Sequence, residues 1–412
     1  MRTIQLFGLR VPFLVLLLIT FGAGDAALAS KYKVLYGFSG GVDGGGLYSG
    51  VIIDASDNLY GGTVGGGDGG GGTIYQLQRQ PDGSWVKIVI HDLDFHTEGG
   101  NPNNGMVFDP AGNLYGTMED GGPQQFGGVF QLVPNPDGPW TLNLLYDIGS
   151  FTGLTLDAAG NLYGLGLGAF ELSPTPDGWT YQQIYGFTGD NDAGGFYSPM
   201  ILDRAGNLYG TAQYGGNHGP PCVGAAGCGV VFKLHPNGDG SWTGHILHKF
   251  AAWLYDGQYS IGGVVRDAAG NLYGTTEQGG SHRTKSGSCE LGCGTIYKLS
   301  RKPDGHWKET ILYNFLHFKD GLFPVAGPTL DGDGNLYGTA SFGGDSNCGC
   351  GVVYKMTHNP DDTWTYSVLH RIHQGEGNGP VAPLVMDKRS NLYGTTVTGG
   401  PGGKGVVFEV TP

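Results

Sequence analysis

One four-residue sequence, Asn-Leu-Tyr-Gly, recurs seven times and constrains the fold more than any other feature of the chain. Its copies begin at Asn58, Asn113, Asn161, Asn207, Asn271, Asn335 and Asn391, at intervals of 46 to 64 residues. A repeat of this length forms one supersecondary unit that buries its apolar surface against its neighbours. The unequal intervals predict a fixed unit that carries loops of variable length.

Each unit has the pattern of four short β-strands. The fifth copy predicts strands at residues 262–266, 272–276, 295–299 and 307–315. Turn sequences join the first strand to the second (Asp267–Asn271) and the third to the fourth (Lys302–Gly305), because Pro presets φ and Gly accepts a positive φ. Five copies read Asp-x-x-Gly-Asn in the first turn, a pattern that also suits calcium, and we interpret it as turn chemistry.

The two ends of the chain complement each other. The seventh copy stops after its third predicted strand, residues 406–410, and residues 33–38 match the fourth strand of the other copies. Pairing of the two ends would leave no exposed sheet edge, as a closed ring requires. We therefore predict an all-β fold, a seven-bladed β-propeller with four antiparallel strands per blade, closed by the N-terminal strand joining the last blade. The third copy lacks the loop after Leu165, so we expect its blade to be short on one face.

The tryptophans recur with the repeat. Six of the seven stand at the start of a fourth strand: Trp85, Trp140, Trp179, Trp242, Trp307 and Trp364. A large aromatic ring at a fixed repeat position is typical of packing between neighbouring units. We expect these six to be structural.

The shared sequence resembles that of the GloVer tandem repeats of bacterial exported proteins. The sixth copy shows the pattern in Gly338–Thr339, Gly343-Gly344 and Gly351–Lys355, and the resemblance covers residues 31–412. It implies an exported, propeller-like repeat protein and no particular reaction. In that family the repeats are coupled to varied C-terminal surface anchors, whereas this sequence ends at Pro412 directly after its last predicted strand, so covalent surface attachment is not carried over.

The first 29 residues have the pattern of a secretory signal peptide. Arg2 and Arg10 precede an apolar stretch at residues 11–21, and Ala27-Leu28-Ala29 offers a small-x-small cleavage site. The stretch is too short to span a membrane. We predict a signal peptide at 1–29, a propeller at 30–412, and a secreted, periplasmic or extracellular protein without a transmembrane segment.

Six cysteines form three close pairs in the sequence, Cys222/Cys228, Cys289/Cys293 and Cys348/Cys350. An even number in an exported chain favours disulfides, and pairing within each loop is the simplest of the 15 arrangements that six cysteines permit. His218 and His282 in the same loops keep a metal-binding alternative open, although only Cys289/Cys293 has a zinc-type spacing. We predict disulfides, no cofactor and no metal in these loops, with a channel-bound cation such as calcium left open.

Charge and motifs exclude several functions. The net charge of −14 disfavours nucleic-acid binding, which requires a basic stripe that neutralises phosphates, so we expect no nucleic-acid partner. The chain has neither a His-Glu-x-x-His sequence nor a phosphate-binding Gly-x-x-x-x-Gly-Lys-Ser/Thr loop. We expect a monomer without a recognisable catalytic motif.

The long connections, from second to third and from fourth to first strand, share one side of a propeller, which we call the long-loop face; the opposite side is the short-turn face. Variable loops on a rigid scaffold are typical binding sites. Eleven residues before the Asp that ends each first strand, six copies carry an acid: Asp43, Glu98, Asp192, Asp256, Asp320 and Glu376. These loop acids are interpreted either as local turn hydrogen-bonders or as a ligand-binding ring at the mouth of the central channel.

Aromatic residues follow several loop acids. They are Tyr48, Phe196, Tyr197, Tyr259 and Phe323, and Trp253 lies in another such connection. Acids beside flat aromatic rings suit sugars, although packing at the start of the strand explains them equally well. Three functions follow as hypotheses: a non-catalytic module that binds carbohydrate or protein through the long-loop face, a glycoside hydrolase or polysaccharide lyase that uses the acids, and a structural surface protein.

Overall fold

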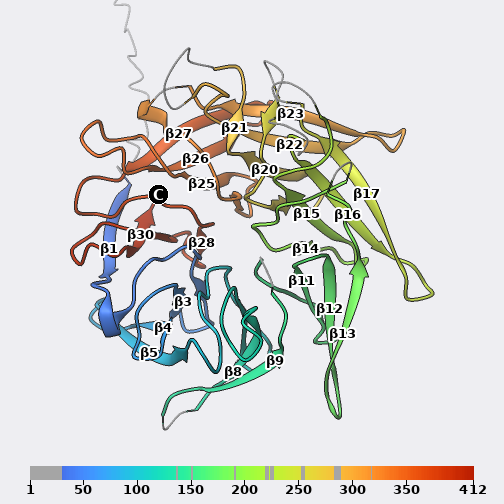
Figure 1. Ribbon diagram of the computed structural model, residues 1–412. Helices are drawn as coiled ribbons and strands as arrows, with labels where there is room; N and C mark the ends of the chain where they lie inside the picture. The colour runs from blue at the N-terminus through green and yellow to red at the C-terminus, as the bar shows by residue number, and fades with distance from the viewer. Residues whose placement is uncertain are drawn as a thin grey trace, which may run out of the picture.

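Seven four-stranded antiparallel sheets follow one another round a ring in this computed structural model (Figure 1). The structure describes residues 30–135, 138–149, 152–189, 192–218, 222, 227–251, 256–282, 289–316 and 318–412. The predicted signal peptide and Trp253 lie outside the described residues. Within them, the helical segments are two single 3₁₀ turns, η1 (Gly41–Asp43) and η3 (Phe318–Asp320). No helix in this part of the chain has the length and apolar character needed to cross a bilayer.

Each sheet is one blade, numbered here in chain order of its innermost strand. Blade 1 contains β2 (Ile52–Ile53), β3 (Leu59–Thr63), β4 (Gly70–Arg79) and β5 (Trp85–Asp94), and blade 2 contains β6 (Val107–Phe108), β7 (Leu114–Met118), β8 (Gly128–Val133) and β9 (Thr141–Tyr146). Blade 3 contains β10 (Thr155–Leu156), β11 (Leu162–Leu165), β12 (Ala169–Thr175) and β13 (Gly178–Tyr185), and blade 4 contains β14 (Ile201–Leu202), β15 (Leu208–Ala212), β16 (Val230–Pro236) and β17 (Trp242–Lys249). Blade 5 contains β19 (Val264–Arg266), β20 (Leu272–Thr276), β22 (Thr295–Arg301) and β23 (Trp307–Asn314). Blade 6 contains β24 (Thr329–Leu330), β25 (Leu336–Ala340), β26 (Val352–His358) and β27 (Trp364–Arg371). Blade 7 contains β28 (Val385–Met386), β29 (Leu392–Thr396), β30 (Val406–Thr411) and β1 (Lys31–Gly37).

The predicted architecture is confirmed, including the closure. β1 pairs antiparallel with β30, from Lys31 opposite Thr411 to Gly37 opposite Val406, and lies beside it at the join of the blue and red ends in Figure 1. Blade 3 is short as expected, since three residues separate β11 from β12. One element was not predicted: β18 (Gly257–Gln258) pairs with β21 (Gln278–Gly279).

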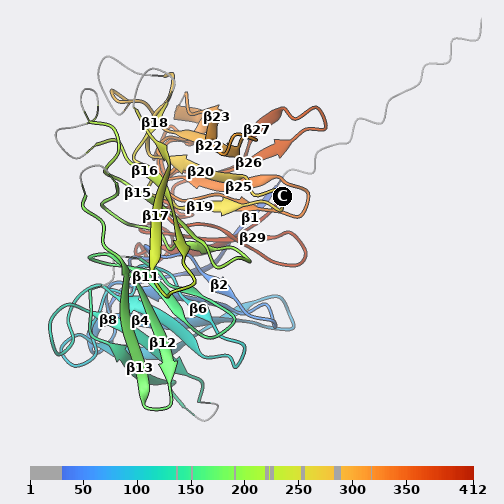
Figure 2. The ribbon, with the colours of Figure 1, turned by 90° about the vertical axis from the view of Figure 1, so that its right-hand side faces the viewer.

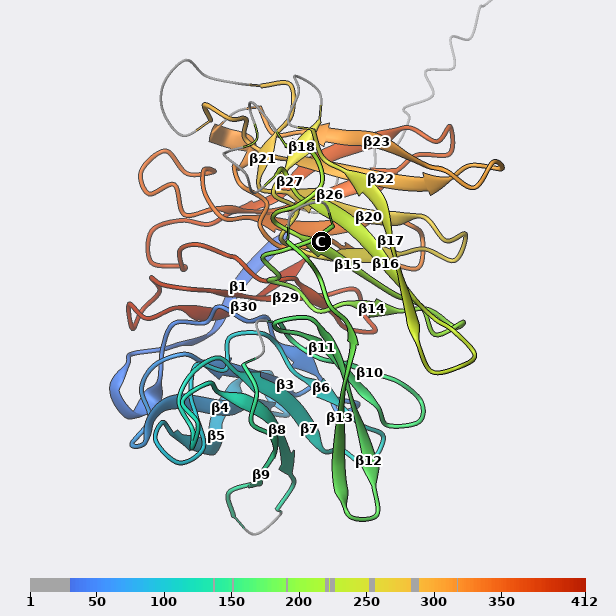
Figure 3. The same ribbon diagram turned by 45° about the vertical axis from the view of Figure 1, so that its right-hand side comes forward.

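The two faces differ as expected from the connections. Figure 2 shows the ring from the side of blades 3 and 4, in green. In Figure 3 the hairpins of β16–β17 and β22–β23 project to the right, on the short-turn face. On the long-loop face, single bridges pair the loop that enters a blade with the loop between its second and third strands, for example Gly45 with Gly65 and Leu322 with Phe342.

The repeated Asp-x-x-x-Asn turn is a closed hydrogen-bond unit in all seven blades. In blade 6, Asp331 accepts from the backbone and side-chain amides of Asn335 and from the Tyr337 hydroxyl. The same bonds recur at Asp54, Asp109, Asp157, Asp203, Asp267 and Asp387. Donors from the repeat itself occupy the carboxylate oxygens, so turn chemistry accounts for the recurring Asp-x-x-x-Asn sequence.

These turns predict how stability depends on pH. Burial alone would raise the pKa of the turn aspartates, but the hydrogen bonds to their carboxylates, those from Asn first, outweigh it and lower the pKa of Asp109, Asp203, Asp267, Asp331 and Asp387. A lowered folded-state pKa contributes stability above the unfolded value of about 3.9, which is lost as the pH falls through the folded-state value. We expect the thermal midpoint to fall steeply below about pH 4. The fall should be shallower in Asp331→Asn, and a midpoint that is constant down to pH 2 would contradict this origin.

The tyrosine of the repeat packs between neighbouring blades. The tyrosine of one blade contacts the tryptophan of the next, with ring centroids 6.0 Å apart for Tyr60–Trp140 and 5.8 Å for Tyr273–Trp364. Trp85 of blade 1 contacts Tyr393 of blade 7 in the same way, at 6.1 Å. The expectation that the recurrent tryptophans pack between units is therefore confirmed.

Candidate functional site

A cavity of about 580 Å³ lies at the centre of the ring. Its lining comes from the segments that lead into the innermost strands of all seven blades, including Tyr48–Ile52, Asn103–Met106, Tyr197–Pro199 and Val381–Val385. Small and apolar residues dominate, and none of the lining residues is an acid, a histidine, a lysine or an arginine. The cavity therefore offers apolar surface and amide or hydroxyl groups to a ligand.

Hydrogen bonds between neighbouring blades position this lining. The Thr395 hydroxyl of blade 7 donates to the Ser49 carbonyl, and the Thr275 hydroxyl of blade 5 donates to the Ala326 carbonyl. The Thr211 hydroxyl of blade 4 accepts from the Gly263 amide in the same region. Since Thr follows Asn-Leu-Tyr-Gly in five copies, the repeat itself fixes the walls of the cavity.

Two of the aromatic residues singled out in the sequence line this cavity and remain accessible. Tyr48 is 51% exposed and Tyr197 is 56% exposed. The others offer less surface, since Phe196 and Tyr259 are buried and Phe323 is half-buried against the Cys289–Cys293 cluster. Trp253 lies outside the described residues. Tyr48 and Tyr197 are therefore the aromatic side chains best placed for a ligand.

The six loop acids are not among the residues that line the cavity; each accepts hydrogen bonds from its own connection or from the preceding outermost strand. Asp43 accepts from the Ser39 amide and the Tyr36 hydroxyl, and Asp192 accepts from the Thr188 and Gly189 amides. Glu98, Asp256, Asp320 and Glu376 likewise contact local amides or the side chain of the preceding outer strand. These contacts correspond to the local hydrogen-bonding interpretation, and ligand binding by the loop acids stays a prediction.

The side chain that contacts a loop acid from the outermost strand stands at the same position in every blade, which the sequence pattern did not show. One position, after the bulge of each outermost strand, carries Tyr36, His91, Tyr146, Tyr185, His248, Tyr313 or His370. We call it the Tyr/His position. Tyr36, His91, Tyr313 and His370 contact the loop acid directly, at 2.7 to 3.2 Å.

These contacts set the charges of the loop acids. Burial alone would raise the pKa of Asp43, but hydrogen bonds from Lys87, Tyr36 and Ser39 outweigh it and lower that pKa. The pKa of Glu98 is lowered in the same way, against burial, by the hydrogen bond from His91. Ionised carboxylates that are already hydrogen-bonded are poor general acids.

Two glutamates that the sequence reasoning missed lie closer to the cavity. Burial raises the pKa of Tyr197, with further contributions from Tyr214 and from the charges of Glu277 and Glu119. Glu119 also accepts from the amide of the cavity-lining Asn103, at 2.6 Å. Burial raises the pKa of Glu277. Both follow their Asn-Leu-Tyr-Gly copy at the same offset, but only two copies carry an acid there, so the pattern does not stand out.

The three predicted disulfides are present, Cys222–Cys228, Cys289–Cys293 and Cys348–Cys350. Each lies in the loop between the second and third strands of its blade, on the long-loop face. No described cysteine is left as a thiol. The Cys293 carbonyl accepts from the Phe323 amide of the next blade, so the bridged loop also braces its neighbour.

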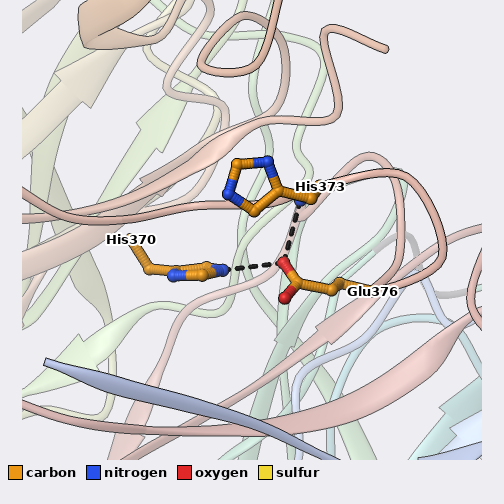
Figure 4. Close-up of side chains that lie close together, drawn as sticks. All are labelled: His370, His373 and Glu376. Atoms are coloured by element: carbon orange, nitrogen blue, oxygen red, sulfur yellow. Dashed lines mark hydrogen bonds and ion pairs between the residues drawn. The ribbon is translucent and has the colours of Figure 1, made fainter. Parts of the chain in front are cut away.

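Two clusters at blade interfaces combine histidine with carboxylates. In the first, the Glu376 carboxylate accepts from His370 at 2.8 Å and from the His373 amide at 2.9 Å (Figure 4). The His373 ring contacts Asp345 at 2.7 Å instead. The second contains His248, Asp256 and Glu309. There, burial and then the charge of Asp256 raise the pKa of Glu309 well above its usual value.

A second cavity, of about 480 Å³, lies on the short-turn face between blades 4 and 5. Basic side chains gather in its lining: Lys233, His245, Arg266, Arg301 and His306. Burial lowers the pKa of Lys233, as do the charges of Arg301 and Arg266, while Asp203 opposes them. This cavity suits an anionic group, in contrast to the uncharged lining of the central cavity.

The sequence matches the Gloeobacter/Verrucomicrobia repeat family over residues 26–171 and 283–412. The chain belongs to this family. Membership confirms the resemblance that was based on the repeated Asn-Leu-Tyr-Gly-Thr sequence. The matched segments include blades 1, 2 and 6 together with the closing pair β30 and β1.

One solved structure supports the fold. The chain is similar to an ancestral GH74 enzyme, with a TM-score of 0.54 and 13% identity, over 90% of this chain and 48% of that one. It thus spans about half the length of that enzyme. It also matches a gluconolactonase from Xanthomonas campestris, with a TM-score of 0.41 and 13% identity, over 92% of this chain and 89% of the other. Comparison with curated proteins gave no match.

Proposed function

We propose that this protein is a secreted, non-catalytic binding module that takes an extracellular carbohydrate at the mouth of the central cavity, on the long-loop face. The observation that carries the proposal is the pairing of an uncharged cavity with two exposed tyrosines, Tyr48 and Tyr197, from blades 1 and 4. Sugar rings stack their apolar faces on aromatic rings and hydrogen-bond through their hydroxyls. Three disulfides favour an oxidising compartment, which fits an exported protein.

The second candidate is a carbohydrate-active enzyme. It is favoured by Glu277, whose pKa burial raises as a general acid requires, and by Glu119, whose charge also acts on Tyr197. The loop acids are less suitable for this role because local donors hold them. Binding is preferred since none of the described residues that line the cavity carries a carboxylate.

The test uses residues 30–412 mixed with insoluble polysaccharides and then centrifuged, with the supernatant assayed for lost protein and for new reducing ends. We expect the protein to pellet with one polysaccharide class and to release no new ends. In Tyr48→Ala/Tyr197→Ala the affinity should fall roughly 30-fold, since each stacking ring contributes about 1 kcal/mol.

The matched control is Phe126→Ala, which removes another exposed aromatic ring from a loop of the long-loop face that does not line the cavity. Its binding should equal that of the parent protein. New reducing ends that disappear in Glu277→Gln would favour the enzyme instead. Failure to pellet with every polysaccharide would reject a carbohydrate ligand and favour a protein partner or a structural role.

A further inference from the structure

The interface between blades 4 and 5 buries one imidazole and two carboxylates from three separate segments. His248 lies on β17, Asp256 follows in the connection to blade 5, and Glu309 lies on β23. Their side chains are 19%, 17% and 14% exposed, and their ligand atoms all lie within 4.8 Å of one another.

The contacts within this cluster are incomplete. His248 Nε2 is 3.7 Å from Asp256 Oδ1 and 3.6 Å from Glu309 Oε2, beyond hydrogen-bonding range. His248 Nε2 and Glu309 Oε1 are both buried without a hydrogen-bond partner. An unsatisfied buried polar atom is costly, and two beside each other indicate that a partner is missing.

The other blades show which kind of side chain stands at the position of Glu309. Glu309 stands opposite Leu299 in its blade, and the equivalent residues are Lys87 opposite Leu77, Tyr366 opposite Met356 and Tyr32 opposite Val410. All three equivalents donate a hydrogen bond to the backbone carbonyl of the loop acid in the connection that leads into their own blade: Lys87 to Asp43, Tyr366 to Asp320 and Tyr32 to Glu376.

Lys87 also places its ammonium group 2.8 Å from the Asp43 carboxylate. In blade 1 the structure therefore puts a positive charge against the loop acid. The three remaining equivalents are uncharged, Leu142, Tyr181 and Gly244. Among the seven described residues at this position only Glu309 is an acid, so this interface has two carboxylates where blades 1, 6 and 7 have a donor or a cation.

The cluster in Figure 4 makes the contrast clear. There, His370 and the His373 amide both point at the Glu376 carboxylate, and the His370 ring stacks on Tyr32 with centroids 4.2 Å apart. Each of these polar groups has a partner. The His248 cluster has the same histidine and loop acid but has gained Glu309 and lost the short His–acid contact.

We propose that His248, Asp256 and Glu309 bind a divalent transition-metal ion, with Zn²⁺ as the first candidate. One imidazole and two carboxylates form a donor set that Zn²⁺ accepts. Ligand atoms on a tetrahedral zinc ion with bonds of ~2.1 Å lie roughly 3.4 Å apart, close to the separations seen here. Asp256 is already oriented by hydrogen bonds from the Ala251 and Gly257 amides, each at 2.7 Å, as second-shell donors orient metal ligands.

Such an ion would fasten blade 4 to blade 5 and fix the connection between them. Three protein ligands would leave one position of a tetrahedral site open to water. This site is independent of the proposed carbohydrate site, because none of its residues lines the central cavity.

The test is calorimetric titration of ZnCl₂ into untagged residues 30–412 stripped with EDTA, with parallel titrations of MnCl₂ and CaCl₂. We expect one Zn²⁺ per chain and a raised thermal midpoint. His248→Ala and Glu309→Gln should each weaken Zn²⁺ binding by about 100-fold or more, since even second-shell changes cost 10–100-fold. His370→Ala/Glu376→Gln should bind Zn²⁺ like the parent protein.

Glu309→Lys provides a separate readout, because it copies the arrangement of Lys87 and Asp43. Its midpoint should rise above that of the metal-free parent and should no longer respond to Zn²⁺ or EDTA. Absence of Zn²⁺ and Mn²⁺ binding, binding of Ca²⁺ alone, or binding that survives both His248→Ala and Glu309→Gln would overturn the proposal.

Discussion

Deletion of residues 30–38 should abolish cooperative folding of the whole ring. The deleted segment contains β1, the outermost strand of blade 7, together with Phe38, which is completely buried against Tyr75 of blade 1. Without it, β30 becomes an exposed edge and the contact between blades 7 and 1 loses the aromatic rings of Tyr36 and Phe38. We expect no cooperative thermal transition by circular dichroism and early elution with aggregates in size-exclusion chromatography.

A permuted chain separates the loss of the strand from the loss of the covalent order. Thr411 lies opposite Lys31, so a short turn can connect the end of β30 to the start of β1. Blade 6 joins its equivalent strands through residues 359–363. A chain that begins at Gly41 and carries a copy of this turn and then residues 31–40 after Pro412 should fold with a midpoint near that of the parent. If the deletion variant keeps the parent midpoint, or the permuted chain fails to fold, closure by β1 is not what stabilises the ring.

The fold could be predicted because the repeat encodes its own contacts. Asp331, Asn335 and Tyr337 lie within seven residues and bond to one another, so their spacing in the sequence is their spacing in the turn. Trp364 recurs at the start of its strand because each blade packs against Tyr273 or its equivalent in the preceding blade. The cysteine pairs were equally local, since Cys348 and Cys350 are two residues apart.

The candidate site was predicted only in part, because spacing along the chain does not show which way a side chain points. Asp43 and Asp320 recur at a fixed distance before the innermost strand, yet both turn back to a tyrosine on the outermost strand. Tyr48 and Tyr197 could be singled out because aromatic residues follow these acids. That both line one cavity could not be predicted, because segments of all seven blades form its wall.

Glu309 illustrates a different limit. Its position carries tyrosine in three blades and four other residue types in the rest, and its importance depends on Asp256 and His248, 53 and 61 residues earlier in the chain. Only the register of β22 with β23, compared with that of other blades, shows that Glu309 replaces a lysine or a tyrosine. Residues that differ between copies carry the individual chemistry of a repeat protein, and repeat analysis alone passes over them.

Gly338→Ala should destabilise the protein strongly, whereas Gly332→Ala, six residues earlier, should not. A Cβ atom at Gly338 would lie 2.4 Å from the Tyr354 hydroxyl oxygen and 2.6 Å from the ring carbon that carries it. Tyr354 is fully buried on β26 and cannot swing away. A Cβ atom at Gly332 meets nothing within 4 Å, and its φ is not in the left-handed region.

Both substitutions restrict the unfolded chain equally, so the difference between them isolates the clash with Tyr354. We expect Gly338→Ala to lower the free energy of unfolding by about 3 kcal/mol, at the upper end of overpacking effects, and Gly332→Ala to change it by less than about 1 kcal/mol. Urea denaturation of both variants measures this difference. Combining Gly338→Ala with Tyr354→Leu should cost less than the sum of the two single substitutions, because the shorter side chain makes room for the new methyl group. Since a phenylalanine or tyrosine ring crosses the same glycine in all seven blades, equal stability of the two single variants would mean that this contact is not why the repeat ends in glycine.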